Sequence, residues 1–281
     1  MESSFEQIRD EQKESWNLFS PGWKKYDEVT MNFMKPIADE MISLLRLKEN
    51  DLVLDVAAGT GEPGLTIAKS LKNGKVIATD LSVGMLSVAE EKAKKQGLNN
   101  YVTMVSDVSE LPFPDHKFDA ITCRMGFMFF PDMRLATREL VRVLKPGGRM
   151  AISVWNVPEK NFWVTAIMNS IKKNLELPLP APEAPGMFRC AKSGLMTGLF
   201  RESGLKNVSE TEINGKFPAG TSEVYWNFMT EVGAPIVAAL SHANAEMKEK
   251  IKREVFELID LTFPDGHVNI DSSALVIFGE K

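Results

Sequence analysis

The chain has 281 residues, 44% of them hydrophobic and 25% charged, with a net charge of −5. This length fits one large α/β domain, or a core of about 150–200 residues with a lid. The acidic balance offers no basic field for nucleic acid or an anionic membrane, and no apolar run is long enough to span a bilayer. Two cysteines suggest neither a disulfide framework nor a metal site, and a secretory signal is lacking, so we expect a cytoplasmic protein without metal.

The first 48 residues are expected to form helices. Residues 5–20 are charged and aromatic and predict one helix, which a Ser20-Pro21-Gly22 turn should end. A second helical stretch then runs to about Leu47. We interpret residues 1–48 as a helical cover.

From Asp51 onward, short apolar runs alternate with helical stretches at about 62–72, 82–96 and 132–144. The apolar runs are Leu52–Val56, Val76–Thr79, Tyr101–Val105, Phe118–Cys123 and Arg149–Val154. Such alternation predicts a parallel sheet with right-handed crossovers, that is, a doubly wound α/β core over residues 49–155.

The pattern loosens after Trp155. Residues 156–190 carry five prolines and are interpreted as a long connection. A helix near 192–203, a strand near 205–217, helices over 222–263 and a last strand near 267–279 follow. Residues 156–281 should therefore complete the core, with a helical substrate lid at about 218–266 inserted before the last strand.

A glycine-rich turn follows the first predicted strand, in Asp55-Val56-Ala57-Ala58-Gly59-Thr60-Gly61-Glu62-Pro63-Gly64. Small residues let the backbone approach a ligand closely, and the next helix offers free N–H groups. Gly59, Gly61 and Gly64 also match the dinucleotide fingerprint, so the neighbouring residues must decide which ligand is bound.

Two acidic residues favour a cationic ligand at this turn. Glu62 stands where a dinucleotide would place its pyrophosphate, which it would repel. Asp55 precedes the turn and is placed to attract an amino group. S-adenosylmethionine carries an ammonium and a sulfonium and no phosphate, so it fits this site better.

Two further carboxylates end the next strands. Asp80 closes the second strand, where it can accept hydrogen bonds from both ribose hydroxyls. Asp107 closes the third strand, where it can accept from an adenine amino group. Carboxylates at successive strand ends face one crevice, which favours a ligand site over simple turn caps.

The sequence resembles the class I methyltransferases, particularly the group that includes the ubiquinone and menaquinone biosynthesis methyltransferases. The resemblance covers about residues 23–155; Ala57 departs from it by replacing a common glycine. The segments that carry it are Asp55–Gly61, Asp80, Asp107 with Leu111-Pro112-Phe113, Phe118-Asp119-Ala120 and Leu144-Lys145-Pro146-Gly147-Gly148. It implies a seven-stranded, mostly parallel sheet and S-adenosyl-L-methionine as cofactor.

By this resemblance, the glycine turn lines the methionine portion of the cofactor, and Asp107 with Val108 lines the adenine. The segment Cys123-Arg124-Met125-Gly126-Phe127 would lie beside the sulfonium, and Tyr26 with Asp27 marks a helix that folds over the cofactor. The predicted cofactor-binding residues are Tyr26, Asp55, Ala57, Gly59, Thr60, Gly61, Asp80, Leu81, Met85, Asp107, Val108, Arg124 and Met125.

No residue stands out as the catalytic base. Arg124, Tyr26 and His242 are candidates, although His242 also suits a solvated helix surface. Further candidates are Trp155 and Asn156, together with Tyr225 and Trp226, for which packing in an apolar helix is the alternative. The residues that would line either an apolar acceptor pocket or a buried junction are Met125, Phe127, Met128, Phe129, Phe130 and Met133.

The favoured function is methyl transfer to a flat or apolar small molecule by in-line displacement, which releases S-adenosylhomocysteine. Two alternatives stay open: a non-catalytic S-adenosylmethionine-binding protein, and an NAD(P)-dependent oxidoreductase, for which we find no Tyr-x-x-x-Lys pair. We expect no nucleic-acid partner and no membrane span, and the oligomeric state is open between monomer and homodimer.

Overall fold

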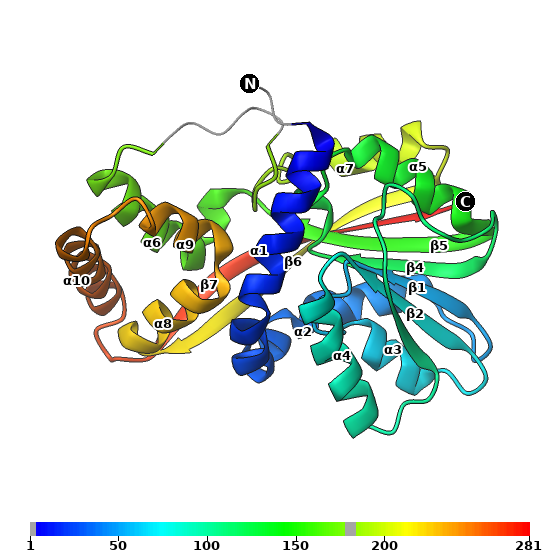
Figure 1. Ribbon diagram of the computed structural model, residues 1–281, viewed down its shortest axis with the longest axis horizontal. Helices are drawn as coiled ribbons and strands as arrows, with labels where there is room; N and C mark the ends of the chain where they lie inside the picture. Colours follow the sequence, from blue (N-terminus) through cyan, green and yellow to red (C-terminus); the bar gives the residue numbers. More distant parts are fainter. Residues whose placement is uncertain (1–3, 178–183) are drawn as a thin grey trace.

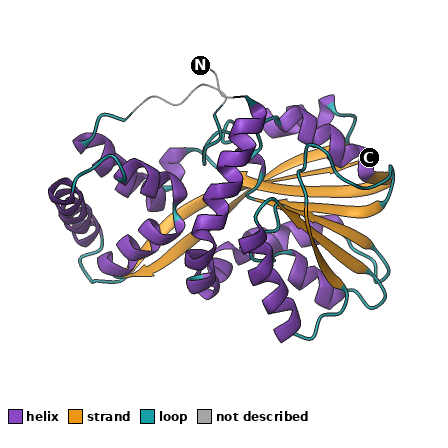
Figure 2. Ribbon diagram, viewed as in Figure 1, coloured by secondary structure: helices purple, strands orange, loops and turns teal. Residues whose placement is uncertain are grey.

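One mixed sheet organises the computed structural model, which describes residues 4–177 and 184–281 (Figures 1 and 2). Its strands lie in the order β3-β2-β1-β4-β5-β7-β6, and β7 alone runs antiparallel to its neighbours. The strands are β1 (Leu52–Val56), β2 (Lys75–Asp80), β3 (Tyr101–Val105), β4 (Phe118–Arg124), β5 (Leu144–Trp155), β6 (Lys206–Gly220) and β7 (Val268–Glu280). The predicted fold, seven-stranded and mostly parallel, is confirmed.

The strand order reverses between β1 and β4, which pair side by side. In doubly wound sheets a ligand crevice opens at such a point, outside the carboxyl ends of the strands. The glycine turn follows β1 directly, and Arg124 ends β4, so both predicted segments meet at this crevice.

Short helices connect the strands of the core. They are α3 (Gly64–Ser70), α4 (Val83–Lys95), α5 (Met133–Val143) and α7 (Leu195–Glu202). Ser82 Oγ accepts a hydrogen bond from the Met85 N–H at 3.1 Å, and Asp132 accepts from two N–H groups of the first turn of α5. These N-caps fix where α4 and α5 begin, close to the crevice.

The N-terminal helix α1 (Phe5–Lys25) continues through the sequence that we interpreted as a turn. Pro21 cannot donate to the Asn17 carbonyl, but Ser20 Oγ donates to that oxygen at 2.9 Å instead. A Cβ at Gly22 would lie 2.1 Å from the Glu231 carbonyl oxygen. The Ser-Pro-Gly segment therefore permits a close helix crossing, and α2 (Asp27–Leu45) begins only after Tyr26.

Part of the predicted long connection is a packed helix, α6 (Phe162–Asn174). Trp163, Val164, Ile167 and Ile171 are buried at helical spacing, and the prolines flank this segment without interrupting it. Pro158 lies in a 3₁₀ turn before α6, and Pro185 follows it. Pro178, Pro180 and Pro182 lie outside the described residues.

A helical insertion separates the last two strands, as predicted. It consists of α8 (Ser222–Val232), α9 (Ala234–Leu240) and α10 (Ala245–Thr262). Gly233 separates α8 from α9, Pro235 lies in the first turn of α9, and Asn244 caps α10 through the Met247 N–H. Figure 1 shows these helices and α6 gathered around the far ends of β6 and β7, beyond the rest of the sheet.

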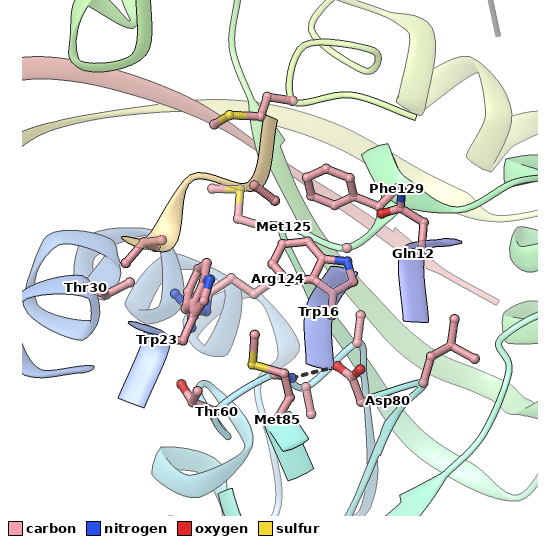
Figure 3. A pocket seen from close by; sticks show the side chains of 18 of the residues that line it. Gln12, Trp16, Trp23, Thr30, Thr60, Asp80, Met85, Arg124, Met125 and Phe129 are labelled. Atoms are coloured by element: carbon pink, nitrogen blue, oxygen red, sulfur yellow. Dashed lines mark hydrogen bonds between the residues drawn. The ribbon is translucent and has the colours of Figure 1, made fainter. Parts of the chain in front are cut away.

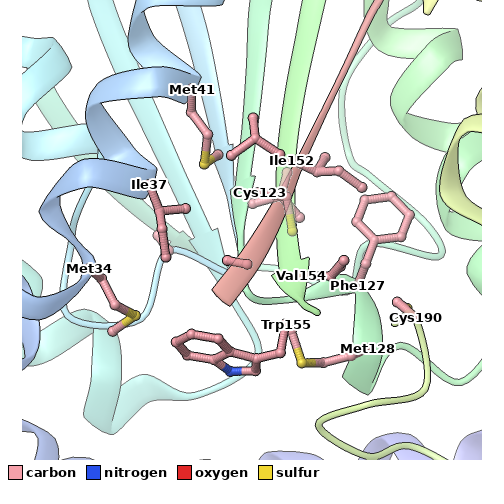
Figure 4. Packing of buried hydrophobic residues seen from close by; sticks show 14 of the residues in the cluster. Met34, Ile37, Met41, Cys123, Phe127, Met128, Ile152, Val154, Trp155 and Cys190 are labelled. Carbon is pink, nitrogen blue, oxygen red and sulfur yellow. The ribbon is translucent and has the colours of Figure 1, made fainter. Parts of the chain in front are cut away.

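Apolar residues of α2 pack onto the sheet beside the crevice. Figure 4 shows Met34, Ile37 and Met41 facing the strands that carry Cys123 and Ile152. The two cysteines are free and buried. Within the described ranges, no helix is long and apolar enough to cross a lipid bilayer.

Candidate active site

A large cavity lies where the carboxyl ends of the strands meet α1, α2, α8 and α9 (Figure 3). It encloses about 1500 Å³, including space open to solvent. Its lining combines the ends of the strands with side chains of the helices, so one continuous space joins the glycine turn to an aromatic wall.

The glycine turn forms one wall of this cavity, and its glycines have separate roles. Gly59 has φ +53°, and a Cβ there would meet no atom within 4 Å, so its backbone faces the open cavity. A Cβ at Gly61 would press on Leu65 and Ala89, and one at Gly64 would lie 2.6 Å from Asp55 Oδ2. Gly59 thus leaves room for a ligand, whereas Gly61 and Gly64 allow the turn to pack against the core.

Asp55 does not face the cavity, contrary to our expectation that it attracts a ligand amino group. It is fully buried, and its carboxylate accepts from Thr122 Oγ1 at 2.7 Å and from the Gly64 N–H at 3.1 Å. Burial raises the pKa of Asp55 to about 7, although the bond from Thr122 opposes this shift. Asp55 therefore supports the turn from beneath.

Asp80 is positioned on the cavity wall by two backbone groups. Its carboxylate accepts from the Gly59 N–H at 2.9 Å, the bond drawn in Figure 3, and from the Ser82 N–H at 2.8 Å. Burial raises the pKa of Asp80, and the bonds from Ser82 and Gly59 lower it. These bonds fix the orientation of the carboxylate on the cavity wall, where the sequence predicts that it accepts from ribose hydroxyls.

Asp107 closes the same wall after β3. Its Oδ1 accepts from the Ser109 N–H at 2.8 Å, and its Oδ2 lies 3.7 Å from Arg9 Nη1 of α1. The predicted cofactor-binding residues that the structure brings together on the wall are Ala57, Gly59, Thr60, Asp80, Leu81, Met85, Asp107, Val108, Arg124 and Met125.

The N-terminal helices cover the glycine turn through Asp27, the neighbour of Tyr26. Asp27 Oδ1 accepts from Thr60 Oγ1 at 3.0 Å and from Lys92 Nζ at 2.8 Å. The Tyr26 hydroxyl donates to Glu231 at 3.3 Å, and neither Tyr26 nor Gly61 lines the cavity. Tyr26 therefore joins the cover to α8 and does not contact the cavity.

Arg124 reaches from the end of β4 along the wall to the N-terminal cover. Its Nε donates to the Glu62 carbonyl at 3.0 Å, and Nη2 lies 3.5 Å from Met31 Sδ of α2. Burial lowers the pKa of Arg124, and the carboxylates of Asp55 and Glu62 oppose that shift. The guanidinium stays charged, because the ordinary arginine pKa lies above 12.

Most of the other catalytic candidates lie outside the cavity. His242 is exposed beyond α9, so it is a surface residue, and the Tyr225 hydroxyl is buried and donates to the Trp163 carbonyl at 2.8 Å. The Asn156 side chain donates a hydrogen bond to the Ser273 hydroxyl, and Trp226 is a buried residue of α8. Trp155 does line the cavity.

The methionine and phenylalanine run divides between wall and core. Met125, Phe129 and Phe130 line the cavity, whereas Phe127 and Met128 are fully buried in the core (Figure 4). Met133 packs beside Cys190. The buried-junction alternative thus holds for part of the run.

Sequence reasoning missed much of the apolar wall. The residues concerned come from α1, α2, α6 and the inserted helices: Trp16, Trp23, Thr30, Phe33, Met34, Trp163, Phe228, Met229, Val232 and Ile236. The helical spacing of Thr30, Phe33 and Met34 was the available signal, but it predicts a buried face without saying what the face covers.

The wall fits S-adenosylmethionine. A bare backbone at Gly59, an oriented carboxylate at Asp80 and a second one at Asp107 follow one another along the wall, in the order in which the sequence predicts contacts to the methionine, ribose and adenine portions. No group of three or more His, Cys, Asp or Glu side chains suited to a metal ion occurs among the described residues.

Comparison with known proteins agrees with this fit. Residues 53–148 match the methyltransferase domain family. The demethylmenaquinone methyltransferase of Bacillus subtilis is 30% identical over 70% of this chain and 91% of its own length.

Two solved structures share the fold. The YcgJ protein of Bacillus subtilis has a TM-score of 0.58 at 23% identity, over 87% of this chain and 97% of that one. A SAM-dependent methyltransferase from Aquifex aeolicus has a TM-score of 0.51 at 24% identity, over 68% and 89%. With the glycine turn and the carboxylates in place, these matches show that the chain belongs to the class I S-adenosylmethionine-dependent methyltransferases, in the menaquinone-type group.

Proposed function

We propose that this methyltransferase acts on a small, apolar acceptor with a flat ring. The observation that carries this proposal is the aromatic part of the cavity, which adjoins the glycine turn. Phe33 stacks on Trp155 at 5.8 Å between ring centroids, and Trp163 lies edge-on to both. Such walls exclude water and favour a flat apolar ligand.

The reaction that suits this site is an in-line displacement. S-adenosylmethionine supplies a methyl group on a sulfonium, which needs little further activation. A bond forms from the acceptor atom to the methyl carbon, the carbon–sulfur bond breaks, and its electron pair stays on sulfur in S-adenosylhomocysteine. The protein's part is to align the two molecules and exclude water.

The described lining of the cavity offers the acceptor no general base away from the cofactor wall. Among the described residues that line it, the titratable ones are Glu62, Asp80, Asp107 and Arg124, all on or beside the strand ends. The acceptor should therefore lose its proton to water before attack. This favours acidic phenols or enols. The Bacillus subtilis relative is named for the methylation of demethylmenaquinone, a compound with a flat ring.

Release of S-adenosylhomocysteine tests this proposal. The panel contains 1,4-naphthohydroquinones with and without a prenyl chain, simple phenols, aromatic amines and free amino acids. We expect turnover with the flat ring compounds, and a rate that rises with pH through the pKa of the acceptor. Turnover of a free amino acid in preference to every ring compound would overturn the proposal.

A further inference from the structure

Two polar atoms of the cavity wall are buried without a partner. Trp23 Nε1 and Thr30 Oγ1 have no hydrogen-bond partner among the residues that the structure describes. Thr30 is only 1% exposed, and both residues line the cavity. Figure 3 shows them towards the same end of the cavity, away from Asp80. Because buried donors are almost always hydrogen-bonded, these two point to a ligand atom.

Comparable groups of the same wall have partners. The Trp163 indole N–H donates to Asn161 Oδ1 at 3.0 Å, and the Thr60 hydroxyl donates to Asp27 at 3.0 Å. Those side chains are therefore satisfied by the fold. Trp23 and Thr30 are not, although they lie on adjacent helices that the fold holds in place.

The third component of this end is the Arg124 guanidinium. Its Nη2 lies 3.5 Å from the sulfur of Met31, the residue after Thr30, so the charge is near the same turn of α2. Arg124 Nη1 has no hydrogen-bond partner within the described part of the chain. An indole N–H, a hydroxyl and a guanidinium together select an oxygen with lone pairs and negative charge.

We propose that Trp23, Thr30 and Arg124 form a subsite for a carboxylate or another anionic oxygen of a bound ligand. This inference rests on the proposed function, because that function places two such oxygens in the cavity. One is the carboxylate at the methionine end of the cofactor, and the other is an ionised oxygen on the acceptor.

Variants Thr30→Val and Trp23→Phe test the subsite by calorimetry with three probes. S-adenosylhomocysteine carries the carboxylate, and 5′-methylthioadenosine lacks the whole amino-acid portion. The third probe, 2-naphthoate, is a flat ring with a carboxylate and is titrated into the S-adenosylhomocysteine complex. Removal of one hydrogen bond to a charged ligand group should weaken binding about tenfold or more.

Two results support the subsite and identify its source. If it holds the cofactor carboxylate, both variants bind S-adenosylhomocysteine about tenfold more weakly and 5′-methylthioadenosine as the wild type does. If it holds an acceptor oxygen, both nucleosides bind normally and 2-naphthoate binds more weakly. Unchanged affinity for all three probes overturns the proposal. Failure of the wild type to bind S-adenosylhomocysteine would count against the proposed function instead.

Matched variants separate binding from folding. Thr137 is a fully buried helix threonine away from the cavity, and its Oγ1 donates to the Met133 carbonyl at 2.7 Å. Thr137→Val should lower the thermal midpoint, whereas Thr30→Val should not, because no bond is lost in the ligand-free protein. Thr30→Ser should restore affinity. An equal fall in midpoint for both valine variants would mean that the Thr30 hydroxyl is structural, and would overturn the proposal.

Discussion

The two ends of the cavity are built in different ways. The cofactor end consists of strand ends and one turn, and backbone groups fix its side chains, as Gly59 and Ser82 fix Asp80. The acceptor end, the aromatic part where we propose that the acceptor binds, gathers side chains from helices far apart in the sequence, such as Phe33 and Phe228, and packing holds most of them. Backbone geometry demands particular residue types, whereas apolar packing accepts many. A substitution at one end should therefore change cofactor affinity or acceptor preference, but not both.

The largest effect is expected at the cofactor end, from Asp80→Ala. Loss of a carboxylate that accepts two ribose hydroxyls should weaken S-adenosylhomocysteine binding about 100-fold, since hydrogen bonds to charged groups contribute about 1.5–3 kcal/mol each. Calorimetric titration measures this. Because Asp80 also bonds to Gly59, the thermal midpoint is measured in parallel. Near-normal affinity would remove Asp80 from the binding site.

At the acceptor end, Phe228→Leu should change the acceptor and spare the cofactor. Phe228 lines the cavity and packs against Phe217 at 4.5 Å between ring centroids. Loss of an aromatic contact is expected to raise the acceptor KM about tenfold, while the affinity for S-adenosylhomocysteine stays within about twofold. Trp226→Leu, on the same helix but off the wall, is the control. A matching loss of cofactor affinity in Phe228→Leu would show that the two ends are not separable.

This difference between the two ends also explains which parts of the site can be predicted from the sequence. The glycine turn, Asp80 and Asp107 follow strands whose apolar runs are short and distinct, so their place at one crevice can be inferred from alternation alone. Asp55 lies in the same motif, yet its burial under Gly64 depends on which way a strand side chain points relative to the turn. The motif therefore places Asp55 in the sequence without assigning its role.

The acceptor end could not be predicted in this way. The break expected at Pro21 is absent because the Ser20 hydroxyl replaces the missing backbone donor, a bond that no periodicity reveals. Likewise, α6 was hidden by flanking prolines, although Trp163 and Ile167 have helical spacing. Which helix faces reach the cavity depends on crossings such as that at Gly22, and crossings are tertiary features.

A smaller effect is expected from Asp27→Ala, which tests whether the cover controls the cofactor end. The variant removes the bonds from Thr60 and Lys92 that join α2 to the turn and to α4. S-adenosylhomocysteine should dissociate about threefold to tenfold faster, because partly exposed ion pairs contribute about 1 kcal/mol or less. Stopped-flow fluorescence measures the rate. Tyr26→Ala should change it less than Asp27→Ala does, and the reverse order would restore Tyr26 as the contact that retains the cofactor.

The last prediction concerns folding stability instead of ligand binding, through a pH dependence that comes from beneath the cofactor end. The folded-state pKa of Asp55 is about 7, above the ordinary aspartate value of 3.8, so the folded protein binds this proton more tightly than the unfolded chain. The contribution of Asp55 to stability is therefore fully present below about pH 4 and is lost as the pH rises towards 7, with a slope of at most about 1.4 kcal/mol per pH unit.

The variant Asp55→Asn tests this dependence. Its side chain cannot ionise and keeps one oxygen for the Gly64 N–H, so the stability of the variant relative to the wild type should increase from pH 4 to pH 7. Urea unfolding from pH 4 to pH 8 measures the difference. Parallel curves would mean that Asp55 ionises freely. A variant that gains stability but loses cofactor affinity would show that the Asp55 charge acts on the ligand as well as on the turn. Asp55 would then belong to the binding site as well as to the structure beneath it.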